Sequence, residues 1–319
     1  MRLTSFNNLL AGWKEFRRGK RGKLDVAAFE FNLEDNLLEL QHALRSQAYQ
    51  PGPYVRFLVR DPKPRVIHKA SVADRVVHQV VFRSLYRRLD PYFIYDSYSC
   101  RRRKGTHAGV ARLETFIRRA SVNYSRSAWT LKCDVRKFFD SIDQNILLTL
   151  LKRQIKDQSI LKLVELIINS FEHVSGRGLP LGNVTSQLFA NVYLNEFDQF
   201  VKHELNQHWY LRYCDDFVIV GRDKDELAAL VPIMAAFLQD QLKLTLHPNK
   251  IILRSARQGM DFLGYIARPH HRVLRTKTKR RIIGRVSRGV SEASWQSYLG
   301  VLSHCRSFGI LQKLLAVKK

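Results

Sequence analysis

Cysteine is scarce in this sequence and widely scattered. Four cysteines occur in 319 residues, and none of them belongs to a Cys-x-x-Cys pair. Zinc modules and disulfide frameworks need closely and regularly spaced cysteines. We therefore expect neither a structural zinc site nor a set of disulfide bonds.

Long apolar runs are also missing. No stretch approaches the roughly 20 apolar residues that a membrane-spanning helix needs. The first residues, MRLTSFNNLLAGWKEF, lack the basic start, apolar core and small-residue cleavage site of a secretory signal. A cytoplasmic protein with no membrane partner is expected. The hydrophobic fraction of 45% and the aromatic fraction of 11% are typical of a globular chain.

Acidic residues are few relative to basic ones. The chain has 28 Asp and Glu against 54 Lys and Arg, which gives a formal net charge of +26. Self-repulsion on this scale opposes a compact state, so a polyanionic partner is expected. Nucleic acid is favoured because its phosphates neutralise Lys and Arg while counterions are released. An anionic membrane surface is the alternative.

The apolar pattern switches between helical and strand-like segments, with no internal repeat. Apolar residues three or four positions apart predict helices at 33–44, 71–89, 142–155, 188–205 and 227–242. The last of these would hold Pro232 in its first turn. Short β-rich runs predict strands at 54–59, 129–135, 209–213, 217–220, 243–246 and 251–253. A basic segment, 272–288, precedes one amphipathic helix expected from Trp295 to Phe308.

Three aspartates lie at the ends of predicted strands. Asp134 ends the apolar run LKCDV, and Asp215 and Asp216 lie at the expected turn of a hairpin. Paired strands would bring these carboxylates together, and their repulsion favours hard cations between them. Two Mg²⁺ ions held in this way are the known arrangement for nucleotidyl transfer. Each acidic site alone is also typical of an ordinary turn or helix cap, so the interpretation depends on the surrounding sequence.

Seven segments surround these aspartates in a fixed order. They are RDPKPRVIHKASVADRVVHQVV, SYSCRRRKGTHAGV, WTLKCDVRKFFDSID, GRGLPLGNVTSQLFANVYLNEFDQFV, LRYCDDFVIV, LTLHPNKIIL and GMDFLGYIA. This succession resembles the blocks of reverse transcriptases and covers most of the chain from Tyr54 to Ala267. The resemblance implies an RNA-directed DNA polymerase that copies template RNA into cDNA from a primer.

The same resemblance implies an α+β fold shaped as a right hand. An N-terminal extension and the fingers would occupy residues 1–125. The palm, an antiparallel sheet backed by helices, would occupy 126–270, with a further fingers segment near 147–178. A small helical thumb would occupy 271–319 and grip the duplex through its phosphates, which predicts steeply salt-dependent binding.

Site residues follow from the resemblance position by position. Two Mg²⁺ ions, for which Mn²⁺ would substitute, are expected on Asp134, Asp215, Asp216 and the backbone of Val135. The nucleotide-binding residues are expected to be Lys63, Arg65, Phe139, Leu181, Gly182, Gln187 and Lys250. Lys63 and Arg65 would clamp the triphosphate. Phe139 takes the place of a steric gate against the ribose 2′-hydroxyl, and its neighbour Phe138 is expected in the core.

Template and primer contacts are expected from a basic run and one tyrosine. These residues are Arg101, Arg102, Arg103, Lys104 and Tyr213. Tyr98 lies beside the basic run and is a candidate for stacking on a base. Asp140 and Asp143 precede an apolar helix and are expected to cap it. His107 shows no metal-ligand spacing and is expected to be structural.

One segment departs from the common reverse transcriptase pattern. Many relatives read Pro-Gln-Gly and then Ser-Pro, whereas this chain has Leu181 in place of the glutamine and Gln187 in place of the proline. This resembles the enzymes of diversity-generating retroelements, which make errors opposite adenine and work with a basic accessory variability protein. Leucine cannot hydrogen-bond as glutamine does, so the check on base pairing is expected to be weaker.

Other functions stay open at this point. A non-polymerising RNA-binding or maturase-like protein would use the basic charge equally well, although it would have no need for all three carboxylates together with Phe139. A retron-type or antiphage reverse transcriptase is the other alternative, against which the expected thumb lacks a Val-Thr-Gly motif. The oligomeric state is open.

Overall fold

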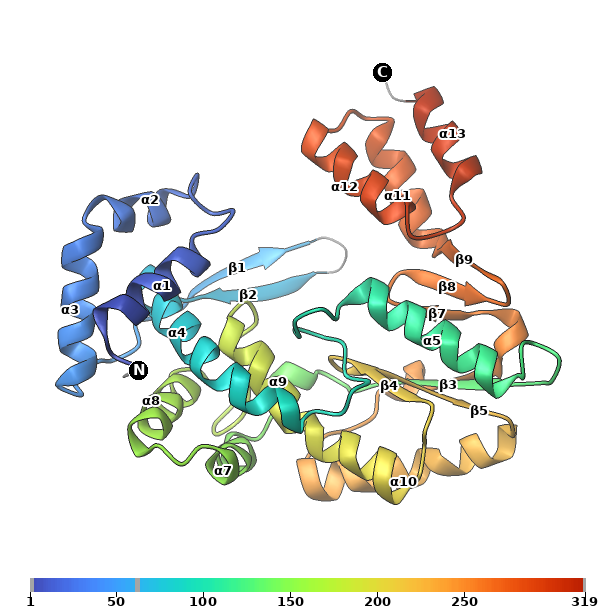
Figure 1. Ribbon diagram of the computed structural model, residues 1–319, viewed down its shortest axis with the longest axis horizontal. Helices are drawn as coiled ribbons and strands as arrows, with labels where there is room; N and C mark the ends of the chain where they lie inside the picture. The colour runs from blue at the N-terminus through green and yellow to red at the C-terminus, as the bar shows by residue number, and fades with distance from the viewer. Residues whose placement is uncertain (1–2, 61–63, 318–319) are drawn as a thin grey trace. The chain divides into compact units, whose positions relative to one another are not determined.

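The computed structural model describes residues 3–60 and 64–317 and divides into two compact units (Figure 1). The first unit contains the chain up to Ile94 together with Arg136–Gln199 and Phe237–Thr245. The second contains Tyr95–Val135, Phe200–Ala236 and the chain from Leu246 onward. Each unit is therefore assembled from segments that are distant in sequence. The expected division into consecutive fingers, palm and thumb segments stays a prediction.

The first unit is mostly helical. Its helices are α1 (Phe6–Phe16), α2 (Leu24–Phe31), α3 (Leu33–Arg45), α4 (Val72–Leu89), α6 (Phe138–Ser141), α7 (Gln144–Gln154), α8 (Gln158–Asn169) and α9 (Val184–Gln199). Helices α1 and α4 pack closely because Gly12 has no side chain: a Cβ there would lie 2.6 Å from Val80 Cγ2. Trp13, fully buried on α1, shows how much apolar surface this packing removes from water.

Side-chain caps begin three of these helices. Ser71 accepts a hydrogen bond from the Asp74 N–H at the start of α4. Asp143 and Asp157 each accept two backbone N–H groups at the starts of α7 and α8. Each such cap contributes about 1 kcal/mol. The capping role expected of Asp143 is confirmed, whereas that expected of Asp140 is wrong, because Asp140 lies inside the short helix α6.

A two-stranded antiparallel hairpin completes the first unit. It consists of β1 (Val55–Val59) and β2 (Arg65–Lys69), and all five residues of β1 are exposed. The backbone N–H of His68 donates to the carbonyl of Leu181 at 3.0 Å. This bond ties β2 to the segment that leads into α9.

The second unit is built on a four-stranded antiparallel sheet. Its strand order is β4-β5-β3-β6, with β3 (Trp129–Asp134), β4 (Tyr210–Tyr213), β5 (Asp216–Gly221) and β6 (Ile252–Ser255). Helix α5 (Thr106–Ala120) covers it, and Leu113 and Phe116 from this helix share a buried cluster with Leu211 and Val218 from the strands. The predicted antiparallel sheet backed by a helix is confirmed.

A smaller sheet and three helices follow in the second unit. The antiparallel strands β7 (Met260–Phe262), β8 (Tyr265–Arg268) and β9 (His271–Leu274) lead into α11 (Thr276–Val286), α12 (Glu292–Leu302) and α13 (Phe308–Val317). Tyr265, Ile282, Trp295 and Ile310 belong to the same buried cluster as α5. One core therefore holds both sheets, α5 and the C-terminal helices together (Figure 1).

Several predicted element boundaries are wrong. The segment expected as one helix from Trp295 to Phe308 is divided, because α12 ends at Leu302 and α13 begins at Phe308. Residues 243–246 form no strand and contribute only an isolated bridge from Leu246 to Val135. Pro232 lies inside α10 (Lys224–Leu242), well past its first turn. Residues 3–60 and 64–317 contain no helix that is both long and apolar enough to cross a membrane.

Candidate active site

The three aspartates lie together where β3 and β5 meet. The antiparallel register places Asp134 directly opposite Asp216, an arrangement that brings Cβ atoms to about 5 Å. Tyr213 pairs with Asp216 from the other side. The β4–β5 turn is Cys214–Asp215, and Cys214 has the left-handed φ of +57° that a tight hairpin requires. The predicted hairpin is confirmed, although Asp216 belongs to the strand and not to the turn.

Main-chain hydrogen bonds hold this arrangement. The N–H of Val135 donates to the carbonyl of Asp215 at 3.2 Å, and the N–H of His247 donates to the carbonyl of Asp134 at 2.8 Å. Arg212, fully buried, donates from Nη1 to the carbonyl of Cys214 at 3.0 Å. Backbone groups and one buried cation therefore position the carboxylates.

Two lysines pair with the carboxylates. Lys250 Nζ lies 2.5 Å from Asp134 Oδ1, so this lysine, expected near the nucleotide, belongs to the acidic cluster. Lys132 Nζ lies 3.2 Å from Asp216 Oδ2. Sequence reasoning missed Lys132, although its place two residues before Asp134 on one strand puts both side chains on the same face.

Burial and mutual repulsion shift the pKa values of the acids. Burial raises the pKa of Asp215 to about 6, and the negative charge of Asp134 acts in the same direction. Burial also raises the pKa of Asp216, against the opposing effect of Lys132. The cluster is thus short of positive charge even with two lysines beside it.

Comparison with known proteins identifies the class to which this cluster belongs. A family model described as "Reverse transcriptase (RNA-dependent DNA polymerase)" matches residues 60–267, more than half of the chain. The chain belongs to the reverse transcriptase family. The match covers the strands that carry all three aspartates, together with Lys132 and Lys250.

Curated relatives of this reverse transcriptase include bacterial proteins. Protein YkfC of Escherichia coli is 24% identical over 281 residues, which cover 75% of this chain and 71% of YkfC. The group II intron-encoded protein LtrA of Lactococcus lactis is 23% identical over 370 residues, which cover 94% of this chain and 59% of LtrA. The chain therefore spans well under two thirds of LtrA.

Solved structures with a similar fold include telomerases. The telomerase of Candida albicans aligns with a TM-score of 0.54 and 13% identity over 86% of this chain and 55% of that one. The apo telomerase of Candida tropicalis aligns with a TM-score of 0.53 and 15% identity over 74% of this chain and 59% of that one. At this identity the likeness shows the fold alone, and it confirms the expected α+β class.

The chemistry of the acidic cluster fits divalent metal ions. Carboxylate oxygens are the hard ligands that Mg²⁺ and Mn²⁺ prefer. Within the described part of the chain, no group of three or more His, Cys, Asp or Glu side chains forms a ready-made metal site. Lys250 and Lys132 each hold one carboxylate instead. Because repulsion raises the pKa of Asp215, a cation between these groups would relieve it.

Asp215→Asn is expected to stabilise the metal-free protein at pH 7 by about 2 kcal/mol. The folded-state pKa of Asp215, about 6, lies above the usual 3.8, so the folded state loses stability as pH rises through that interval. Below about pH 4 both folded and unfolded states hold the proton and the gain disappears. Thermal unfolding in EDTA from pH 4 to pH 8 measures it. A difference that does not change with pH would contradict the assignment.

Several residues expected to bind the nucleotide come together in the first unit. Arg65 begins β2 and is exposed. Gly182 packs against the same strand, because a Cβ at its φ of +116° would lie 2.9 Å from Ile67 Cγ2. The hydrogen bond from His68 to the Leu181 carbonyl fixes the neighbouring residue. The segment before α9 and the strand that carries Arg65 thus form one local structure.

The remaining nucleotide-binding predictions have mixed positions. Phe138 is 2% exposed, which confirms it as core, whereas Phe139 is only partly buried, with its ring centroid 5.3 Å from that of Phe138. Gln187 is exposed on α9. Lys63 lies outside the described residues. The roles of Phe139 and Gln187 stay predictions.

The residues expected to contact template and primer lie in the second unit. Lys104 donates to the Tyr95 carbonyl at 2.7 Å and covers the Tyr95 ring at 3.4 Å, while Arg102 and Arg103 are exposed. Tyr98 is only 3% exposed, so the expectation that it stacks on a base is wrong: its ring belongs to the core.

Two other residues of the second unit have structural contacts. Tyr213 accepts a 3.4 Å hydrogen bond from Thr106 Oγ1. His107 stacks on His304 with ring centroids 3.6 Å apart, which confirms a structural role.

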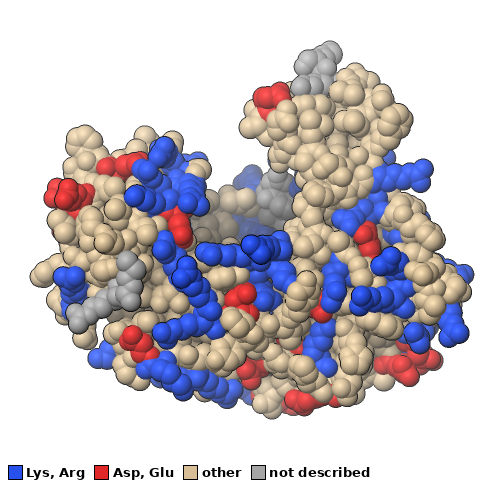
Figure 2. All heavy atoms as spheres, viewed as in Figure 1, with Lys and Arg blue, Asp and Glu red and all other residues tan. Residues whose placement is uncertain are grey.

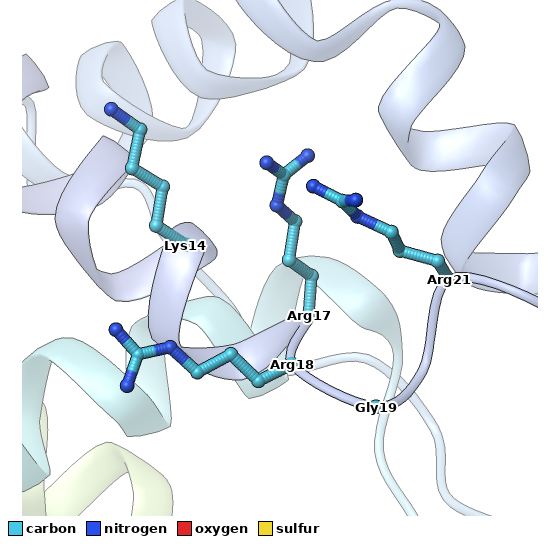
Figure 3. Close-up of a pocket in the computed structure, with 5 residues that line it drawn as sticks. All are labelled: Lys14, Arg17, Arg18, Gly19 and Arg21. Carbon is cyan, nitrogen blue, oxygen red and sulfur yellow. The ribbon is translucent and has the colours of Figure 1, made fainter.

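A basic pocket lies in the first unit, apart from these residues. It is lined by Lys14, Arg17, Arg18, Gly19 and Arg21 and encloses about 460 Å³ (Figure 3). Arg17 also pairs with Glu30 on α2. Figure 3 shows the guanidinium groups of Arg17 and Arg21 side by side, and Arg18 pointing away. Lys and Arg side chains outnumber acidic ones across the face shown in Figure 2, as the net charge of +26 requires.

Proposed function

We propose that this chain is an RNA-directed DNA polymerase that copies template RNA into cDNA. The observation that carries the proposal is the cluster of Asp134, Asp215 and Asp216, held by strand pairing inside a chain of the reverse transcriptase family. Two divalent ions on these carboxylates would activate the primer 3′-hydroxyl and stabilise the leaving pyrophosphate. The backbone of Val135 borders the same site.

Other residues of the chain are proposed to bind and orient the substrates. Lys250 supplies fixed positive charge beside Asp134, where the phosphates of a nucleotide would need it. Arg65, exposed at the start of β2, is suited to a triphosphate clamp together with Lys63. Phe139 is proposed to exclude ribonucleotides by the bulk of its ring. Exposed Arg102 and Arg103 would contact the template strand.

Primer extension on a defined RNA template tests this function directly. The reaction would contain Mg²⁺ and all four deoxynucleotides, and the products would be sequenced. Template-copied DNA is the expected result. DNA made without reference to the template would move the chain to the antiphage type. Intact RNA binding without any synthesis would favour the non-polymerising RNA-binding protein.

We further propose that copying is error-prone opposite adenine, as in diversity-generating retroelements, with a basic accessory protein as a partner. This finer assignment depends on the segment from Leu181 to Gln187, since LtrA is a group II intron-encoded protein. Leu181 is tied to β2 through its carbonyl, so its side chain is the part free to differ between lineages. A leucine there contributes no hydrogen bond to a base pair.

Leu181→Gln is expected to lower the error frequency opposite template adenine several-fold, since a hydrogen bond of about 1 kcal/mol is regained. Errors opposite the other three bases would change less. Sequencing of cDNA made by both proteins on one template gives the spectrum. Leu179→Gln, at a residue 2% exposed, is not a suitable control, whereas Gln187→Asn preserves an exposed amide and is. An unchanged spectrum for Leu181→Gln would contradict the retroelement assignment.

A further inference from the structure

Lys132 is a nearly buried lysine with two acceptors on different sheets. Its residue is 9% exposed. Its Nζ lies 3.2 Å from Asp216 Oδ2 and donates to the backbone carbonyl of Asp261, also at 3.2 Å. A buried ammonium group is tolerated only when it is paired and hydrogen-bonded in this way. Lys132 therefore connects a carboxylate of β5 to strand β7.

Asp261 continues this connection toward the C-terminal helices. Its carboxylate accepts a hydrogen bond from Arg275 Nε at 2.7 Å. Arg275 is the N-cap residue of α11, and its own backbone N–H donates to the carbonyl of Gly264 in the β7–β8 turn at 3.0 Å. A continuous polar path thus runs from Asp216 through Lys132 and Asp261 to the first turn of α11, entirely within the second unit.

A second ion pair fixes the same region without touching this path. Arg272 on β9 binds Glu114 on α5 through two nitrogens, at 2.7 and 2.5 Å. Both ion pairs anchor the segment that carries α11, but only the Asp261 pair leads to an acid of the candidate active site. The two pairs therefore provide a matched comparison.

We propose that Lys132 is a positioning residue that holds the Asp216 carboxylate, and that the Asp261–Arg275 ion pair links its placement to helix α11. The inference rests on the proposed polymerase function. Helix α11 is strongly basic, with Lys277, Lys279 and Arg280 in its first turns. A nucleic acid held by α11 would thereby favour the arrangement in which Asp216 is correctly placed. A measured energetic coupling is the evidence that such a link requires.

Lys132→Met tests the positioning role. Turnover at saturating primer–template and nucleotide is expected to fall about 10- to 100-fold, the usual effect of removing a group that orients a metal ligand. The affinity for Mn²⁺, measured by electron paramagnetic resonance without nucleotide, is expected to stay equal or rise, since a competing positive charge is removed. Lys132→Arg keeps the charge and should retain more turnover than Lys132→Met.

Asp261→Asn and Glu114→Gln test the link to α11. Each variant exchanges one carboxylate for an amide and weakens one ion pair of the same region. Asp261→Asn is expected to lower turnover several-fold and to be less than additive with Lys132→Met, because both act on one path. Glu114→Gln is expected to leave turnover at saturating primer–template unchanged.

The outcomes separate the parts of this inference. Wild-type turnover in Lys132→Met, or a parallel fall of turnover, Mn²⁺ affinity and melting temperature, would overturn the positioning role. Equal effects of Asp261→Asn and Glu114→Gln would overturn the link to α11. Absence of extension by the wild-type chain would overturn the polymerase function itself, whereas wild-type extension beside an unaffected Lys132→Met leaves that function standing and removes only this inference.

Discussion

Replacement of Asp134, Asp215 or Asp216 by asparagine is expected to lower primer extension by about 10³-fold or more. Asparagine keeps the shape of each side chain and removes the negative charge that a divalent ion requires. Asp134 and Asp216 are cross-strand partners, so loss of either one leaves the other without half of the charge of the site. Single-turnover extension with excess enzyme measures the chemical step without the contribution of product release.

Asp157→Asn is the matched control for these variants. It makes the same chemical change at the N-cap of α8, where asparagine caps a helix as well as aspartate does, so activity and stability should remain. The expected stabilisation by Asp215→Asn removes unfolding as the reason for lost activity at that position. Extension within tenfold of wild type in all three aspartate variants would contradict the proposed site.

Affinity for an RNA–DNA duplex is expected to fall about 10³-fold or more between about 50 and 200 mM salt. A chain with 54 Lys and Arg can neutralise many phosphates, and each released counterion adds to the slope of log affinity against log salt. The paired change Lys277→Gln, Arg280→Gln on α11 is expected to lower that slope by about 2, one for each phosphate that is no longer neutralised.

Two further double variants show which basic surface binds. Arg18→Gln with Arg21→Gln removes charge from the basic pocket and is expected to lower the slope for a long structured RNA by about 2. Lys156→Gln with Lys162→Gln removes the same charge beside or on α8 and should leave the slope unchanged. Equal slopes for all of these proteins would show that affinity follows net charge and not these surfaces.

The aspartate cluster could be predicted because its geometry depends on short-range rules. Strand alternation and a two-residue turn are visible in LRYCDDFVIV, and pairing with LKCDV brings Asp134 to the same place. The same alternation points to Lys132, yet a lysine in an apolar strand is usually an exposed residue. Its partners, Asp216 and the Asp261 carbonyl, belong to strands distant in sequence, and no local pattern identifies them.

The errors in the helices have a similar origin. Helix α10 begins at Lys224, where Asp223 accepts hydrogen bonds from two backbone N–H groups, so the helix is longer than its apolar pattern and Pro232 falls inside it. Phe308 continues an apolar face in the sequence but is 75% exposed, and the helix is interrupted before it. Tyr98 resembles a stacking residue in sequence, while its burial depends on α5 and β4.

The pairing of Asp134 with Asp216 has a consequence for how such a chain can change over evolutionary time. The two residues are held opposite each other by main-chain groups, which every amino acid supplies. Neighbouring side chains in β3 and β5 can therefore be exchanged widely while the acids stay in place. A single inserted or deleted residue in either strand cannot be absorbed, because it would turn one acid to the opposite face of the sheet. Drift by substitution is thus tolerated here, and drift in length is not.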